Sequence, residues 1–243
     1  MELYTLATGS TGNCYILKDD DGKSIILDCG IKFSDITHHP AFPKFKDLDF
    51  VFVSHSHHDH DKSLKDFKLT GCEIVSYETL QPKVQNITIG NWECITFPVP
   101  HNVSNWGIVI KSKLTNERFC YVTDFTAIPK IEGIDYWLYE VNYIEGLVDK
   151  MIEDNRDLSH LGFNNHNSLE KAVEYFGSLN TKPKKIYCCH SSASHSIRNI
   201  IHKHIKQFAG WRCWHSVNIS FRLLKRHDDW WRSSVVLMKI IFA

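Results

Sequence analysis

The feature that most constrains this chain is a histidine-rich motif directly after an apolar run. The run FVFV precedes residues 55–60, which read HSHHDH and have the pattern H-x-H-x-D-H. Side chains two residues apart on an extended segment point the same way, so His55 and His57 can present imidazoles to one ion. A turn after the strand reverses side-chain direction, which lets Asp59 and His60 serve a second ion nearby. The motif therefore predicts a loop that binds two metal ions.

The side-chain types in this motif limit which metals it suits. Neutral imidazole and carboxylate ligands suit zinc, manganese or iron. The motif holds no cysteine, which argues against a purely structural zinc site. A polar, histidine-rich surface loop is the alternative interpretation. We expect two divalent metal ions, zinc or manganese, as cofactors.

Two ions need more ligands than this motif supplies, so further histidine or aspartate residues are expected at strand ends. Three residues each follow an apolar, strand-like run: His101, Asp124 and His190. The end of a strand holds a ligand on a rigid scaffold, with little entropy to lose on binding. Each residue taken alone fits a polar cap at a strand end, and the three together are the candidates for the further metal ligands.

The length and charge of the chain fit one domain of enzyme size. Its 243 residues, 43% of them hydrophobic, can bury one substantial core, and no linker divides them. We expect a catalytic domain over residues 1–220 and leave the structure of the tail, residues 221–243, open. The 28 Lys and Arg balance the 28 Asp and Glu, so no overall positive field concentrates nucleic acid. A nucleic-acid substrate would have to be held locally.

The tail and the cysteines bear on partners and location. Residues 235–243 are apolar apart from Lys239, which fits either a last element closing the core or an apolar surface for self-association as a homodimer. No apolar run approaches the roughly 20 residues that span a bilayer, and no signal-peptide pattern opens the chain. The eight cysteines form no C-x-x-C pair. We expect a reduced, cytoplasmic protein without a membrane partner.

Short strand-like runs dominate the first half of the chain, and strand and helix alternate in the second half. The expected strands are residues 3–8, 13–17, 24–27, 50–53, 73–76, 92–97, 106–111, 118–122 and 185–189. The expected helices are residues 169–176, with Ser168 as the cap, and residues 196–208. An antiparallel-rich strand series with helices packed outside predicts an α/β layered sandwich with its site on loops at one sheet edge.

The complete order of these residues resembles the metallo-β-lactamase fold superfamily, over about residues 1–220. The resemblance implies a four-layer αββα sandwich that holds two ions. It assigns one ion to His55, His57 and His101, the other ion to Asp59, His60 and His190, and a bridging role to Asp124. It also implies a hydroxide between the ions as the nucleophile, because two cations lower the pKa of a shared water.

Four segments are most similar to the YycJ-type group of exonuclease-like proteins, which are related to ribonuclease Z. The segments are TGSTGNC at residues 8–14, LDCG at 27–30, EVNY at 140–143 and SHL at 159–161. By this resemblance Asp28 orients the histidine motif, and His160 matches the residue of G-H-L-S that protonates the leaving group. Asn102 and Ser159 depart from the group, which has Asp and Gly there. The first segment fits either a tight turn or a phosphate cradle.

The resemblance implies a dinuclear phosphodiesterase for nucleic acid or a nucleotide, with Asp59 and His160 as catalytic residues. An exonuclease needs a basic groove, whereas a cyclic-nucleotide phosphodiesterase of the phage counter-defence type needs only a small pocket. The balanced charge favours the small substrate, and the four segments favour the exonuclease. Thioester or lactam hydrolysis is a further alternative that fits Asp59 and the His160 segment less well. A binding module without activity would be expected to lack a ligand, and none is missing.

Overall fold

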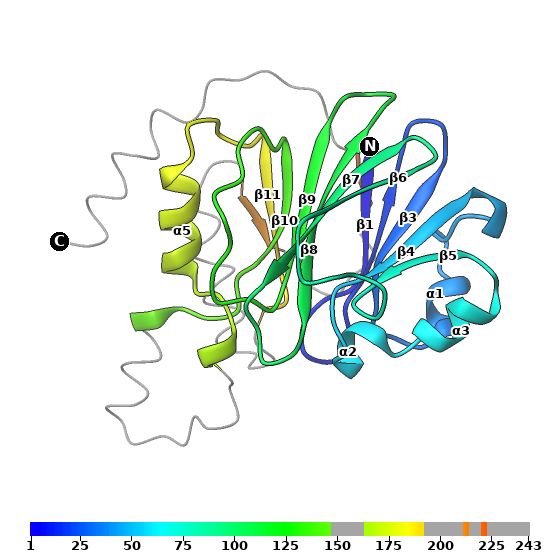
Figure 1. Cartoon of the computed structure of the whole chain (residues 1–243), viewed down its shortest axis with the longest axis horizontal. Coiled ribbons are helices and arrows are strands. Elements are labelled where there is room, and N and C mark those ends of the chain that lie inside the picture. The colour runs from blue at the N-terminus through cyan, green and yellow to red at the C-terminus, as the bar shows by residue number, and fades with distance from the viewer. Residues whose placement is uncertain (147–162, 192–210, 214–219, 223–243) are drawn as a thin grey trace.

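Two β-sheets packed face to face form the centre of the molecule, with helices on both outer faces (Figure 1). This computed structural model describes residues 1–146, 163–191, 211–213 and 220–222. The first sheet has the order β13-β1-β2-β3-β4-β5. Its strands are β1 Glu2–Ala7, β2 Cys14–Lys18, β3 Ser24–Cys29, β4 Leu48–Val53, β5 Glu73–Ser76 and β13 Ser220–Arg222.

The second sheet has seven strands in the order β12-β11-β10-β9-β8-β7-β6. They are β6 Gln85–Ile89, β7 Trp92–Val99, β8 Asn105–Ser112, β9 Arg118–Val122, β10 Tyr136–Glu140, β11 Lys185–Cys189 and β12 Trp211–Cys213. The described helices are α1 Phe33–Thr37, α2 His58–Asp61, α3 Leu64–Leu69 and α5 Leu169–Ser178, with short 3₁₀ turns at Phe45–Asp47 and Phe163–Asn165.

Each sheet is antiparallel in one half and parallel in the other. In the first sheet β13, β1, β2 and β3 pair antiparallel, and β3, β4 and β5 pair parallel. In the second sheet β6 to β9 are antiparallel, and β9 to β12 are parallel. Six of the eleven described strand pairs are antiparallel, as expected, and the other five are parallel. The parallel pairs matter because the carboxyl ends of parallel strands meet at one edge of a sheet.

Three apolar clusters account for the four layers. The central cluster joins the inner faces of the two sheets and includes Leu17, Phe52, Ile110 and Tyr121. A second cluster lies between the second sheet and α5, and a third lies under α1 and α3. The αββα sandwich predicted from the sequence is thus confirmed.

Helix α5 shows how the local sequence sets these layers. The Ser168 hydroxyl accepts a hydrogen bond from the Lys171 amide at 3.1 Å, which caps the helix. Its buried residues recur at helical spacing and face the second sheet: Leu169, Ala172, Val173 and Phe176. The helix predicted at residues 169–176 is confirmed within two residues at its end.

The remaining sequence predictions divide into observed, missed and undescribed elements. All nine predicted strands are present within two residues at either end, while β6, β10, β12, β13 and the short helices near residues 33–69 were missed. The helix expected at residues 196–208 and the tail beyond residue 222 lie outside the described residues. The domain division at residue 220 stays a prediction. In the described part of the chain, no helix is both long and apolar enough to cross a membrane.

Candidate metal centre

The residues that the sequence predicted as ligands gather at the edge where the parallel strands end. His55 follows β4, Asp124 follows β9 and His190 follows β11. His101 follows the antiparallel strand β7, and residues 57–60 run from the loop after β4 into α2. Both sheets therefore contribute side chains to one site, as expected for loops held at the end of a rigid scaffold.

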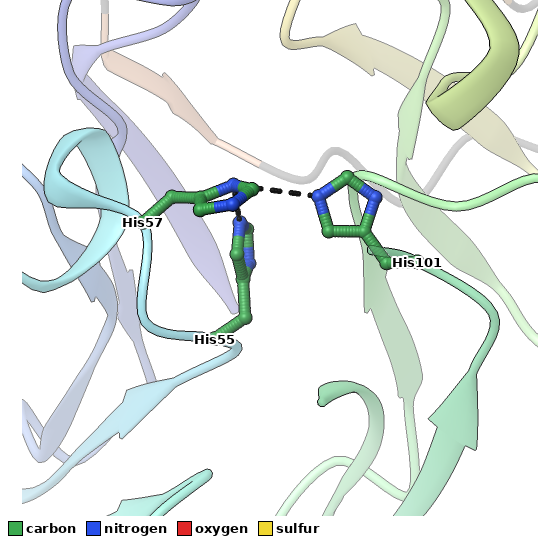
Figure 2. Close-up of side chains that lie close together, drawn as sticks. All are labelled: His55, His57 and His101. Atoms are coloured by element: carbon green, nitrogen blue, oxygen red, sulfur yellow. Dashed lines mark hydrogen bonds between the residues drawn. The ribbon is translucent and has the colours of Figure 1, made fainter. Parts of the chain in front are cut away.

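His55, His57 and His101 form the first of two groups. His55 Nε2 and His57 Nδ1 lie 3.0 Å apart, and His57 Nδ1 and His101 Nε2 lie 3.4 Å apart. In Figure 2 dashed lines join the His57 ring to both His55 and His101, and His101 reaches in from the opposite side of the site. One nitrogen of each ring lies within 4.8 Å of the others, which fits three ligands of one ion.

Asp59, His60 and His190 form the second group, and Asp124 connects the two groups. The Asp59 carboxylate lies 3.4 Å from His60 Nε2 and 3.3 Å from His190 Nε2. Asp124 lies 3.0 Å from His60 Nε2, and its carboxylate also forms a cluster with His55 and His60. One carboxylate therefore reaches a histidine of each group.

The backbone is strained at three residues of this edge. Asp28, Asp124 and His190 have positive φ angles of 55°, 53° and 49°, in a region that residues other than glycine seldom occupy. The Asn105 side chain donates to the carbonyls of Thr123 and Asp124 at 2.9 and 2.6 Å. These two hydrogen bonds stabilise the backbone around Asp124 in its positive-φ conformation, just past the end of β9.

Asp28 lies beneath His60 and has no exposed surface. Its Oδ2 accepts a hydrogen bond from His60 Nδ1 at 2.5 Å and another from the Ser54 hydroxyl at 3.0 Å. The Ser54 amide donates to Oδ1 at 2.7 Å. A carboxylate on Nδ1 fixes the tautomer of the ring and leaves Nε2 free for a ligand role. The expectation that Asp28 orients the motif has this physical basis.

Asp59 is held from below by the glycine-rich loop near the N-terminus. The Asn13 amide donates to the Asp59 carbonyl at 2.7 Å, and Asn13 Nδ2 lies 3.3 Å from the Asp59 carboxylate. Within the loop, the Gly9 amide donates to Asn13 Oδ1 and the Gly12 amide to the Gly9 carbonyl. Three N–H groups that a phosphate would need are therefore engaged, which favours the interpretation of this loop as a tight turn.

Sequence reasoning missed two residues of the site, Glu140 and His166. The buried Glu140 ends β10, and its Oε1 accepts from His166 Nδ1 at 2.7 Å and from His190 Nδ1 at 3.0 Å. The EVNY segment marked Glu140 without giving it a role. The signal for His166 is the order His166-Asn167-Ser168 directly before a helix, which repeats the H-x-S of the G-H-L-S segment. His160, chosen instead, lies outside the described residues.

Burial and paired charges shift the histidine pKa values in opposite directions in the two groups. Burial lowers the pKa of His55 and of His101. Burial also acts to lower the pKa of His60, but the carboxylates of Asp124 and Asp28 outweigh it and raise that pKa well above its usual value. For His190, Asp124 and the hydrogen bonds to Asp59 and Glu140 outweigh burial and raise the pKa to about 10.

The carboxylates show the complementary shifts. Burial acts to raise the pKa of Asp59, but hydrogen bonds from His190 and His60 hold it well below its usual range. Burial is likewise outweighed at Asp124, whose pKa is lowered by the charges of His190 and His60. Without metal, the second group is thus a network of protonated imidazoles and ionised carboxylates.

The donor set fits a pair of divalent ions. Its seven predicted members offer imidazole nitrogens and carboxylate oxygens in buried or half-buried positions. The clusters include no thiolate, although six of the seven cysteines with described side chains are buried elsewhere. Nitrogen and oxygen donors of this kind suit zinc, manganese or iron.

Comparison with known proteins bears on the fold and on part of the sequence. A model of the metallo-beta-lactamase superfamily matches residues 7–71, which include the HSHHDH motif. The solved structure of YhfI from Bacillus subtilis is similar over 90% of this chain and 98% of its own, with a TM-score of 0.67 at 16% identity. The protein has the metallo-β-lactamase fold. The resemblance seen in the sequence is thereby confirmed.

Two further structures share this metallo-β-lactamase fold. The short form of human tRNase Z matches 92% of this chain and 100% of its own at a TM-score of 0.63 and 12% identity. Yeast PDE1 matches 90% of this chain and 98% of its own at a TM-score of 0.58 and 11% identity. No curated protein matches the sequence. At such identities the likeness shows the fold alone, so the activity has to be argued from the site.

Proposed function

We propose that the protein is a metal-dependent phosphodiesterase that acts on nucleic acid in an exonuclease-like manner. The observation that carries this proposal is the complete His and Asp cluster at one edge of the sandwich, with a histidine and carboxylate pair beside it. The similar fold of human tRNase Z supports the same proposal. A binding module would not need this concentration of buried charge, which costs free energy to bury.

The ligand assignment follows the two groups. We propose His55, His57 and His101 for one ion, Asp59, His60 and His190 for the other, and Asp124 between them. Two zinc or manganese ions, when bound there, would lower the pKa of a shared water and polarise a phosphoryl oxygen. Asp28 and Glu140 would keep the rings of His60 and His190 in the orientation that leaves Nε2 available.

His166 is the proposed proton donor to the leaving oxygen. Its Nδ1 donates to Glu140 at 2.7 Å, so its Nε2 is the nitrogen free to face a substrate. Burial acts to lower the pKa of His166, but the charge and hydrogen bond of Glu140 outweigh it and raise that pKa. A raised pKa favours the protonated ring, which is the form a general acid needs. The ring centroid lies 5.9 Å from His101 and 5.2 Å from His190, beside both groups. His160 remains the candidate implied by the sequence resemblance.

Hydrolysis of a cyclic nucleotide is the second candidate. The balance of 28 basic and 28 acidic residues favours a small substrate over a polymer, and yeast PDE1 has a similar fold. Thioester or lactam hydrolysis is a third and less favoured activity. The same metal centre would serve each of these, so the substrate has to be determined by assay.

The first test is hydrolysis of 5′-labelled DNA and RNA beside 3′,5′-cyclic nucleotides, with added manganese or zinc. Asp59→Ala removes a carboxylate from the centre, and Asp66→Ala removes an exposed one from α3 as the matched control. We expect polymer degradation that falls at least about a hundredfold in Asp59→Ala only. Turnover of cyclic nucleotides alone would instead support the second candidate. If the protein hydrolysed neither polymers nor cyclic nucleotides, the proposed phosphodiesterase activity would be refuted.

Metal binding is expected to weaken as the pH falls. The raised pKa values of His60 and His190, the latter about 10, mean that both rings carry a proton at neutral pH without metal. An ion has to displace these protons, so each proton released lowers the apparent affinity about tenfold per pH unit below the pKa. Calorimetric zinc titration at pH 7.5 in two buffers of different ionisation enthalpy counts the protons. We expect at least one released per chain, and none would contradict the assignment.

A further inference from the structure

The hydroxyl of Tyr121 connects the two sheets directly beneath the candidate metal centre. Tyr121 lies in β9 of the second sheet, and its ring is wholly buried against Tyr15 and Phe52 of the first sheet. Its hydroxyl donates to Oδ2 of Asp28, near the end of β3 in the first sheet, at 2.5 Å. This hydrogen bond joins residues 93 positions apart in the chain.

The carboxylate of Asp28 accepts hydrogen bonds from residues of both sheets. Its Oδ2 also accepts from His60 Nδ1 at 2.5 Å and from the Ser54 hydroxyl at 3.0 Å. Ser54 directly follows strand β4 of the first sheet, and His60 lies in helix α2 after that strand. Among these three donors to Oδ2, Tyr121 is therefore the one that fixes the carboxylate relative to the second sheet.

The position of Tyr121 along β9 adds a second connection. Asp124 lies three residues further on, just past the end of β9, and contacts His60 Nε2 at 3.0 Å. Strand β9 thus carries Tyr121, whose hydroxyl bonds to Asp28, the partner of His60 Nδ1. The same strand leads to Asp124, which contacts His60 Nε2. The two contacts define where the His60 ring lies between the sheets.

We infer that Tyr121 is a positioning residue for the metal centre, because its hydroxyl fixes Asp28 and through it the ring of His60. This inference rests on the proposed metal site. The Asp χ2 torsion is broad, so a carboxylate that loses one of its donors can rotate, and the ring bonded to it moves as well. Partners that orient a metal ligand typically contribute a factor of about 10 to 100 in metal affinity.

The experiment compares Tyr121→Phe with Tyr136→Phe. Tyr136 lies in the neighbouring strand β10, is also buried, and donates to the buried carboxylate of Glu117 at 3.1 Å. Both variants remove one hydroxyl from a buried tyrosine and carboxylate pair, but Glu117 contacts none of the candidate ligands in the described hydrogen bonds. Zinc affinity is measured by competition with a chelator, and the visible spectrum is recorded for the cobalt-loaded proteins.

We expect Tyr121→Phe to bind zinc about tenfold more weakly and to change the cobalt spectrum, while Tyr136→Phe matches the wild type. Equal affinities and spectra in all three proteins would overturn the inference. A similar loss in both variants would also overturn it, since packing alone would explain that result. If the wild type bound no metal, the proposed function would fail together with the inference.

A measurement on the wild-type protein covers the case in which Tyr121→Phe does not fold. Carbon-13 at the Cζ position of tyrosine reports on the hydrogen bond of each hydroxyl. Addition of zinc is expected to shift the Tyr121 signal, because its acceptor also holds His60, and to leave the Tyr136 signal in place. A Tyr121 signal that does not respond to zinc would overturn the inference.

Discussion

Replacing Gly30 with alanine is expected to remove metal binding by Asp59 and His60. A Cβ at Gly30 would lie 1.7 Å from the Asp59 carbonyl oxygen and 2.7 Å from the His60 amide nitrogen. To restore an ordinary contact of 3.4 Å the loop has to move by about 1.7 Å, which breaks the Asn13 to Asp59 hydrogen bond at 2.7 Å. Ligand geometry tolerates errors of only about 0.5 Å. We expect zinc affinity to fall at least about a hundredfold, and overpacking to cost about 1–3 kcal/mol of unfolding free energy.

The matched control for this prediction is Gly146→Ala. Among the described residues, no atom lies within 4 Å of a Cβ at Gly146, and this glycine does not have a positive φ. Zinc titration and urea unfolding of both variants separate the local clash from a general effect of adding a methyl group. The prediction fails if Gly30→Ala binds zinc within about threefold of the wild type.

Replacing His166 with alanine is expected to lower turnover by a factor that depends on the leaving group. For a nucleic-acid or cyclic-nucleotide substrate, whose leaving alkoxide needs a proton, we expect a loss of about 10² to 10⁴. For bis(p-nitrophenyl) phosphate the leaving phenolate needs no proton, so the loss should be small. Turnover of both substrate types under saturating metal is the measurement. The reason is structural, since the buried Glu140 holds the proton-bearing ring beside the ligand groups.

His160→Ala is the companion variant, because the sequence resemblance assigned the proton transfer to that residue. If His166 has the role, His160→Ala should retain most of the activity toward both substrate types. An equal loss for both substrates in His166→Ala would mean that the residue supports the metal site without supplying a proton. A selective loss in His160→Ala would restore the earlier assignment.

The candidate ligands were accessible from the sequence because their signals are local. His55 and His57 stand two apart after a strand, and Asp124 and His190 each follow an apolar strand. The two-residue alternation of side chains along a strand and the position of the strand end can both be predicted from neighbouring residues. Strand β10 and its terminal Glu140 were missed because the run of buried aromatic and leucine residues, YWLY, has no alternating pattern.

The sequence by itself determined the fold, the nine strands recognised in it and the seven candidate ligands, since each depends on short-range patterns and their order. Only the tertiary structure decided that His166 joins the cluster, that Glu140 serves two histidines and that Tyr121 holds Asp28. These contacts join residues 26, 50 and 93 positions apart. The Tyr121 contact arises where the two sheets pack face to face, and the two Glu140 contacts arise where β10, β11 and the loop before α5 meet. No local pattern in the chain encodes which buried side chains meet in either place.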